Sequence, residues 1–217
     1  MLAVIIIIVS SYLLGSFPSA YFASRLSGGK GVNRSGADNT GASSVWHTKS
    51  RPWGIAVFLA DAAKGVIPPL VCRLLDLGIA LEAAGGVAAV AGHNWSVFLK
   101  FRGGRGISTI VGALFIIAPV ELGIALVISF IGIPLRSFSL FNLVSLASLP
   151  FLGAFLGMGA AVVTGETAIA LLGIAKRLEA NRRPLDPTRN RWLVLLYRFL
   201  YDRDVRDRKA WMAGKGG

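Results

Sequence analysis

The sequence WGIAVFLADAAKGVIPPLVCRLL, residues 53–75, decides the class of fold, because it is apolar over the length that a helix needs to cross a bilayer. That length is about 20 residues. Three further runs have the same character, at residues 1–23, 79–99 and 107–135. In the whole chain of 217 residues 54% are hydrophobic and 16% are charged, whereas a soluble domain carries roughly 25% charged residues. The pattern predicts an all-α, polytopic transmembrane helix bundle.

The basic residues gather between these runs rather than within them. They occur at residues 25–51 and 100–105, and twelve of the 23 lysines and arginines fall at 176–215. Cytoplasmic loops carry the excess of lysine and arginine, so we predict a cytoplasmic C-terminus and an N-terminus outside, which requires an odd number of crossings. The first run has no basic segment before it, and we therefore interpret it as a retained helix rather than a signal peptide.

The number of crossings depends on two long runs. Three spans are clear from the pattern: residues 1–24, 53–75 and 79–99. Residues 107–135 and 138–175 each suit either one long span or a hairpin, which gives five or seven crossings in total. The breaks at Pro119 and at 157–159 favour about seven short helices.

The end of the chain differs in composition from the rest. We predict one transmembrane domain over residues 1–185 and a basic cytoplasmic tail over 186–217, in which the aromatic and apolar segment 192–201 suits an interfacial helix. Orientation and anionic lipid head groups explain the net charge of +12, so nucleic acid is not expected as a partner. The single cysteine, Cys72, excludes an intramolecular disulfide framework and a cysteine-based metal cluster.

Two glycine-rich loops on the predicted cytoplasmic side carry polar and basic side chains. They read GGKGVNRSGADNTGASSVW at 28–46 and GHNWSVFLKFRGGRGIST at 92–109. Glycines let backbone N–H groups converge on an oxyanion, a helix start adds partial positive charge, and arginine and lysine add charge-assisted bonds. The P-loop spacing is missing, so nucleotide hydrolysis is not expected. Judged on spacing alone, the loops suit phosphate binding and solvated turns equally.

Three ionisable residues lie in or beside the apolar runs. Asp61 and Lys64 interrupt the run at 53–75, and their i, i+3 spacing suits either a structural ion pair or a pair facing a site. His93 follows an apolar helix and suits either a hydrogen-bonding scaffold role or a catalytic one. The sequence has neither an H-E-x-x-H motif nor a G-x-S-x-G elbow, so neither a metal nor a serine-hydrolase site is predicted.

At this point several segments together resemble one family, the bacterial acyl-phosphate:glycerol-3-phosphate acyltransferases. The resemblance covers about residues 1–185. The segments that carry it are GSFPSAYFASRL (15–26), SGADNTGASSVW (35–46), DAAKG (61–65), FLKFRGGRGIST (98–109) and SLASL (145–149). Of these, the segment at 98–109 is the most specific.

The resemblance implies a seven-helix enzyme of the bacterial inner membrane whose active face is cytoplasmic. Such enzymes transfer a fatty acyl group from acyl phosphate to the 1-hydroxyl of glycerol 3-phosphate. The product, lysophosphatidic acid, enters phospholipid biosynthesis. The resemblance implies no metal and no cofactor, and it leaves the oligomeric state open.

Together the loops and the resemblance predict the site residues. Catalytic roles are expected for Arg105, Ser145 and His93, of which Arg105 stands where the family has a lysine and so keeps the charge with a different geometry. The residues expected to bind substrate or phosphate are Asn39, Gly41, Lys64, Lys100, Arg102, Gly103, Gly104, Gly106, Ser108 and Asn181.

The third motif of the family is altered. Leu171, Ile174 and Arg183 align with its histidine, asparagine and glutamate, and we predict that Asn181 and Glu179 take over polar roles. Two alternatives therefore remain beside the enzyme. One is a catalytically weak paralogue that binds phospholipid precursors or a partner enzyme, and the other is a small anion transporter.

Overall fold

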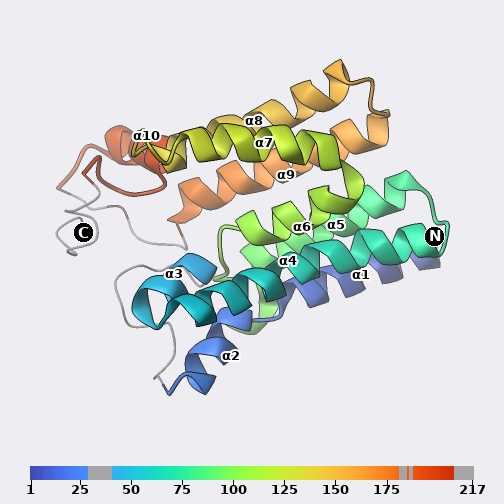
Figure 1. The fold of residues 1–217 in the computed structure, drawn as a ribbon, viewed down its shortest axis with the longest axis horizontal. Helices are drawn as coiled ribbons and strands as arrows, with labels where there is room; N and C mark the ends of the chain where they lie inside the picture. Colours follow the sequence, from blue (N-terminus) through green and yellow to red (C-terminus); the bar gives the residue numbers. More distant parts are fainter. Residues whose placement is uncertain (29–40, 181–184, 186–187, 208–217) are drawn as a thin grey trace.

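The computed structural model describes residues 1–28, 41–180, 185 and 188–207, and within these ranges all regular structure is helical (Figure 1). The helices are α1 (Leu2–Ser16), α2 (Ser19–Leu26), α3 (Ala42–Thr48), α4 (Arg51–Leu74), α5 (Ile79–Asn94), the 3-10 turn η1 (Val97–Leu99), α6 (Ile107–Ile117), α7 (Pro119–Ile131), α8 (Phe138–Phe155), α9 (Ala160–Glu179) and α10 (Arg191–Tyr201). The all-α prediction is confirmed.

In the described part of the chain, seven helices form the bundle: α1 and α4 to α9. They run alternately in opposite directions, so that α1 begins and α9 ends at opposite ends of the bundle (Figure 1). Both undecided runs therefore fold as hairpins. The first turns at Ala118, where Pro119 occupies the first position of α7 and needs no intrahelical hydrogen-bond partner. That all seven helices cross the membrane, and in which orientation, remains a prediction.

Two predicted spans are shorter than expected. The helix predicted over 1–24 ends at Ser16, because Pro18 has no backbone N–H and cannot continue it, and α2 begins anew at Ser19. The helix predicted over 79–99 ends at Asn94. Its last carbonyl groups accept hydrogen bonds from a later loop, as described below.

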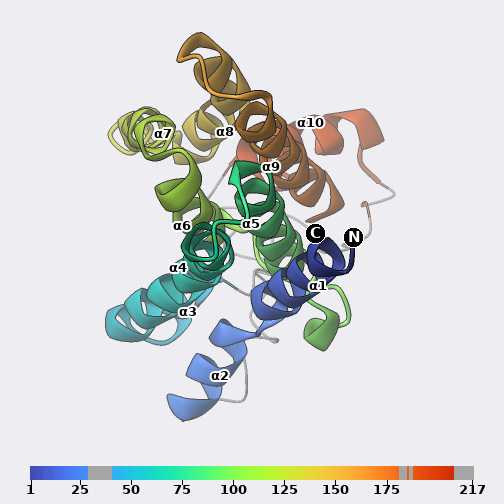
Figure 2. The same ribbon diagram turned by 90° about the vertical axis from the view of Figure 1, so that its right-hand side faces the viewer.

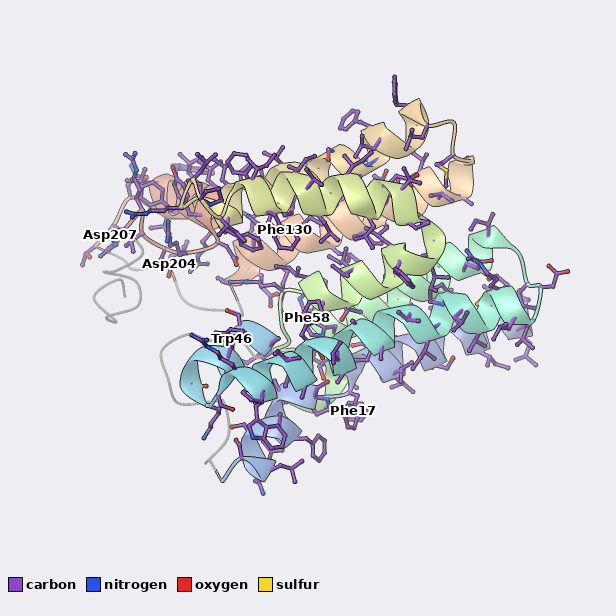
Figure 3. All side chains as sticks on the ribbon, viewed as in Figure 1. Phe17, Trp46, Phe58, Phe130, Asp204 and Asp207 are labelled. Carbon is purple, nitrogen blue, oxygen red and sulfur yellow. The ribbon has the colours of Figure 1, made fainter. Side chains whose placement is uncertain are left out.

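The outside of the bundle is apolar and part of its inside is polar. Among the residues that the structure describes, three helical segments are long and apolar enough to cross a membrane: Leu2–Leu26, Arg51–Leu74 and Phe138–Phe155. Helices α6 and α7 are shorter apolar helices. Phe17, Phe58 and Phe130 are 49%, 40% and 56% exposed on the outer surface (Figure 3). Among the buried residues are Asp61, Lys64, Glu121 and Glu166. Exposed aromatic residues around buried charges are typical of a protein whose solvent is lipid.

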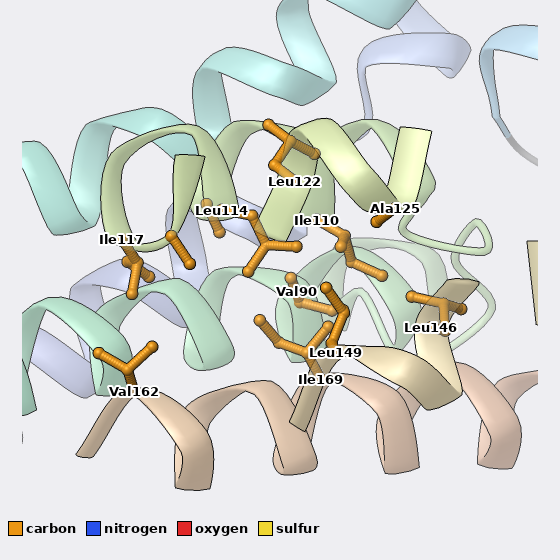
Figure 4. Packing of buried hydrophobic residues seen from close by; sticks show 12 residues of the cluster. Val90, Ile110, Leu114, Ile117, Leu122, Ala125, Leu146, Leu149, Val162 and Ile169 are labelled. Carbon is orange, nitrogen blue, oxygen red and sulfur yellow. The ribbon is translucent and has the colours of Figure 1, made fainter. Parts of the chain in front are cut away.

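Helix α5 is the central element and contacts α1, α4, α6 and α9 (Figure 2). A cluster of buried side chains, including Val90, Leu114, Leu149 and Ile169, connects α5 and α6 to the hairpin of α8 and α9 (Figure 4). Glycines allow the closest helix contacts. A Cβ atom on Gly15 would collide with the carbonyl of Ala89, which shows how closely α1 lies on α5.

We expect Gly112→Ala to destabilise the bundle. A Cβ atom at Gly112 would collide with the carbonyl of Ala62, and Gly65 faces the carbonyl of Thr109 in the same way, so α4 and α6 would have to separate. Overpacking of this kind costs about 1–3 kcal/mol, measurable as a lower unfolding temperature in detergent. Gly123→Ala is the matched control, since a Cβ atom there has nothing within 4 Å. Equal stability of the two variants would contradict the prediction.

Candidate functional site

A polar cluster lies where the break between α1 and α2 meets α4, the end of α5 and the second glycine-rich loop. It surrounds a narrow cavity of about 10 Å³. The cavity is lined by Gly15, Ser16, Phe17, Pro18, Ser19, Asp61, Lys64, His93, Ser96, Leu99, Gly103 and Gly104. Three stretches of the chain, residues 15–19, 61–64 and 93–104, therefore meet at one point.

Asp61 is the centre of this cluster. Its Oδ1 atom accepts hydrogen bonds from Ser19 Oγ at 2.8 Å and from Lys64 Nζ at 2.6 Å, and it lies 3.7 Å from His93 Nδ1. Asp61 is only 2% exposed, and Lys64 and His93 are also buried. In such a poorly solvated place each polar contact matters more than it would in water.

The break in the first helix supplies a further partner for Lys64. Because Pro18 interrupts the helix, the carbonyl group of Phe17 accepts a hydrogen bond from Lys64 Nζ instead of continuing the intrahelical series. The Phe17 ring also lies beside the ammonium group, with its centroid 5.8 Å from Nζ. Asp61 and Lys64 thus form an ion pair that also lines the cavity. The predicted structural pair is confirmed, and its role in a substrate site remains a prediction.

The second loop folds back onto the end of α5. Gly103 N–H donates to the carbonyl of Asn94 at 3.1 Å, and Gly104 N–H donates to that of His93 at 3.2 Å. A Cβ atom on Gly104 would collide with His93 Nε2, so this nitrogen faces the loop. The Asp61 carboxylate lies on the Nδ1 side, and its negative charge favours the tautomer protonated at Nδ1, which leaves Nε2 able to accept a hydrogen bond.

We expect Gly104→Ala to reduce activity more than stability. The added methyl group would displace the His93 ring, whereas in Gly103→Ala it would collide with the backbone carbonyls of His93 and Asn94. A ring displaced by about 1 Å costs on the order of 100-fold in rate. Activity and unfolding temperature, measured together, should show a larger loss of stability for Gly103→Ala. Full activity of Gly104→Ala would contradict a role for the ring.

Arg105 follows these glycines but does not line the cavity. Its Nε atom is 3.0 Å from both carboxylate oxygens of Asp202, and its Nη1 donates to the carbonyl of Lys176 at 2.7 Å. Burial raises the pKa of the Asp202 carboxyl above its ordinary value, while the charges of Arg105 and Arg177 act in the opposite direction. The arginine contact therefore favours the charged form of Asp202.

The end of α9 joins the loop to the rest of the bundle. Glu179 accepts hydrogen bonds from Trp95 Nε1 at 2.7 Å and from Lys176 Nζ at 3.1 Å. The Lys176 ammonium lies 5.1 Å from the Trp95 ring centroid. On the next helix face, Arg177 donates to Asn142 Oδ1 at 2.9 Å. Glu179 thus contacts the tryptophan at the end of α5, near the cavity.

The structure shows where one altered position of the third motif lies. Leu171, aligned with the histidine of the family, is 61% exposed on the outside of α9. A side chain on the outer surface does not contribute to this cluster. The polar contacts of Glu179 lie about two turns farther along the same helix.

The predicted site residues are only partly brought together. Lys64, His93, Gly103 and Gly104 line the cavity, and a Cβ atom on Gly106 would collide with Asn94. The others lie outside its lining: Ser108 is half-buried in the first turn of α6, Lys100 and Arg102 are exposed, Gly41 precedes α3, and Ser145 is buried on α8. Asn39 and Asn181 fall outside the described residues.

Sequence reasoning missed Ser19 and Ser96 as members of the cluster. Ser96 Oγ donates to the carbonyl of Ser16, which ties the loop to the end of α1. The position of Ser19 directly after Pro18 could have indicated its role. Where a helix is interrupted and begins again within an apolar run, its backbone and hydroxyl groups are free to bond to a neighbouring helix.

A second, wider hollow lies between α3 and α4. It has a volume of about 340 Å³ and is lined by Ala42, Ser43, Trp46, Gly54, Ile55 and Phe58. Trp46 and Phe58 are 40% exposed at its edge. It is therefore an open, largely apolar groove on the outer surface, along the same helix that carries Asp61.

Comparison with known proteins places most of the sequence in one protein family. The glycerol-3-phosphate acyltransferase family matches residues 5–185. The chain belongs to this family. A relative from Dehalococcoides mccartyi, glycerol-3-phosphate acyltransferase 5, is 34% identical over 97% of this chain and 93% of its own length. The glycerol-3-phosphate acyltransferase of Desulforudis audaxviator is 38% identical over 81% of this chain and 88% of its own length.

Solved structures of the family have the same fold. Crystal structures of PlsY, an integral membrane glycerol 3-phosphate acyltransferase, were obtained in a glycerol 3-phosphate form and in a lysophosphatidic acid form. They resemble this chain with TM-scores of 0.73 and 0.72, at 28% identity, over 83% of this chain and 91% of theirs. The chain is accordingly a membrane protein of the acyltransferase family, and the resemblance predicted from its motifs is confirmed.

Proposed function

We propose that this protein transfers a fatty acyl group from acyl phosphate to the 1-hydroxyl of glycerol 3-phosphate and releases lysophosphatidic acid and inorganic phosphate. The observation that carries the proposal is the loop at 103–106, which folds onto His93 and places Arg105 beside the end of α9. Membership of the acyltransferase family supports it.

The chemistry of the cluster suits two anionic substrates with one apolar tail. In the proposed reaction Arg105, with Lys100, Arg102 and backbone N–H groups of the glycine-rich loop, binds the two phosphates. The glycerol hydroxyl attacks the acyl carbonyl carbon, a C–O ester bond forms, and the bond between that carbon and the phosphate oxygen breaks. The hydroxyl proton passes to the departing phosphate, so atoms and charge balance. Positioning and charge stabilisation supply most of the rate.

His93 and Lys64 have supporting parts in this scheme. His93 Nε2 faces the loop and accepts a hydrogen bond from the glycerol hydroxyl, while the Asp61 carboxylate lies 3.7 Å from Nδ1 on the other side of the ring. Lys64 pairs with Asp61 and holds its carboxylate in place. Ser145 and Gly41 belong to the proposal as further substrate contacts on α8 and before α3.

The proposed location is the bacterial inner membrane with the cluster at the cytoplasmic end. The loops at 25–51 and 100–105 and the segment after α9 carry most of the basic residues, and cytoplasmic loops are enriched in such residues. That face would admit a soluble phosphorylated acceptor while the acyl donor stays in the lipid.

The test is an assay of the purified full chain in lipid nanodiscs with acyl phosphate and glycerol 3-phosphate. We expect equal amounts of lysophosphatidic acid and inorganic phosphate, and no product when an acyl thioester replaces acyl phosphate. Binding of glycerol 3-phosphate without turnover would instead support the weak paralogue. Turnover only with a thioester donor would overturn the proposed donor.

A further inference from the structure

The C-terminal segment returns to the functional site. The family match ends at residue 185, and α10 and the residues after it lie beyond that point. Two contacts tie this segment to the end of α9: Arg177 Nη1 donates to the carbonyl of Phe199 at 3.3 Å, and Arg198 Nη1 donates to that of Leu178 at 3.3 Å. Within the segment, Arg198 Nε pairs with Asp204. The segment predicted as a tail is thus packed against the bundle.

The geometry at the end of α10 sets the direction of one carboxylate. Asp202 follows the helix in a left-handed conformation, with φ of 58°, and its N–H donates to the carbonyl of Arg198 at 3.0 Å. Its side chain is 22% exposed and reaches Arg105, which is 15% exposed and 97 residues earlier in the chain. A contact between two poorly solvated charges fixes both side chains more firmly than an exposed pair would.

Arg105 is thereby held from two sides. Asp202 engages Nε, and the carbonyl of Lys176 engages Nη1. A guanidinium carries more N–H donors than these two contacts use, and its planar shape points the remaining donors in a fixed direction. A lysine ammonium at this position would rotate freely about one contact. Two contacts therefore fix the orientation of an arginine side chain more than that of a lysine side chain.

We propose that Asp202 is a positioning residue for the phosphate site: it orients Arg105, so that the C-terminal segment 191–204 forms part of the site. The inference rests on the proposed function, because it assumes that Arg105 binds substrate phosphate. It extends the site beyond the region that the family match covers. The Dehalococcoides relative aligns over 97% of this chain, so that alignment includes the segment 191–204.

The test is a double-mutant cycle between Asp202 and Arg105, in full-length protein in nanodiscs. Asp202→Asn keeps the shape and removes the charge, and Asp202→Glu keeps the charge. Asp207→Asn is the matched control, which changes an exposed carboxylate three residues after this segment. The affinity for glycerol 3-phosphate and the values of kcat and KM are measured with arginine and with alanine at position 105.

With Arg105 present, we expect Asp202→Asn to lower kcat/KM and the affinity by about 10-fold, and Asp202→Glu to recover most of that loss. With alanine at position 105 the same change should have an effect of less than about twofold, because Asp202 acts only through the arginine. Asp207→Asn should stay within about twofold in both backgrounds.

An equal loss in both backgrounds would overturn the proposal, as would increased activity of Asp202→Asn, which would identify an inhibitory contact instead. If the wild-type protein binds glycerol 3-phosphate without turnover, the proposed function fails. The double-mutant cycle, measured by affinity for glycerol 3-phosphate alone, then decides the role of Asp202. Neither binding nor turnover by folded wild-type protein would overturn both proposals.

Discussion

Asp61→Asn is expected to lower the free energy of unfolding by about 3–5 kcal/mol, because it leaves the Lys64 ammonium buried without its counter-charge. The same change removes the group that faces His93 Nδ1, so we expect kcat/KM to fall by more than about 100-fold. Both quantities are measured on purified protein, by chemical denaturation in mixed micelles and by release of inorganic phosphate.

A paired replacement separates the structural role of Asp61 from the functional one. Asp61→Leu combined with Lys64→Met removes both buried charges and should recover most of the lost stability, since well-packed apolar side chains often replace a buried ion pair at no cost. Activity should not return. Asp76→Asn, the same chemical change at an exposed position, is the control and should alter stability by less than about 0.5 kcal/mol. An active double variant would show that the pair only supports the fold.

Arg105→Ala is expected to lower kcat/KM by about 10²–10³-fold, because the proposed reaction needs a fixed positive charge beside the phosphates. Arg105→Lys should lie between this variant and the wild type, since it keeps the charge and loses the planar array of donors. Initial rates over a range of glycerol 3-phosphate concentrations measure both effects.

Arg136→Ala is the matched control for this experiment, because it removes an exposed arginine from the connection between α7 and α8. Its activity should stay within about twofold of wild type. Wild-type activity of Arg105→Ala would refute the phosphate-binding role of Arg105 and leave the acyltransferase proposal to stand on other residues.

Hydrophobicity was sufficient to predict the class of fold. The runs at 53–75 and 107–135 are apolar enough to predict membrane helices, and Pro119 marked the turn between α6 and α7. The end of α5 was less predictable. Trp95 and the residues after it are as apolar as a membrane helix requires. The helix nevertheless ends at Asn94, where the carbonyls of His93 and Asn94 accept hydrogen bonds from Gly104 and Gly103.

The site was predictable where its residues are close in sequence and not where they are distant. The spacing of Asp61 and Lys64 already indicated a pair on one helix face. In contrast, nothing local to Asp202 indicates that it meets a residue 97 positions earlier. The composition of the last segment suggested a basic tail with an interfacial helix at 192–201. It did not indicate the contact of Asp202, because a composition does not report which tertiary contacts its charges make.

The alternating course of the seven helices restricts how this fold can be rearranged. Many soluble domains tolerate circular permutation because their termini lie close together. Here the start of α1 and the end of α9 lie at opposite ends of the bundle (Figure 1). A peptide joining them would have to run through lipid along the full length of the bundle, and only a further helix can satisfy its backbone there. Reordering the gene would therefore require an eighth spanning segment.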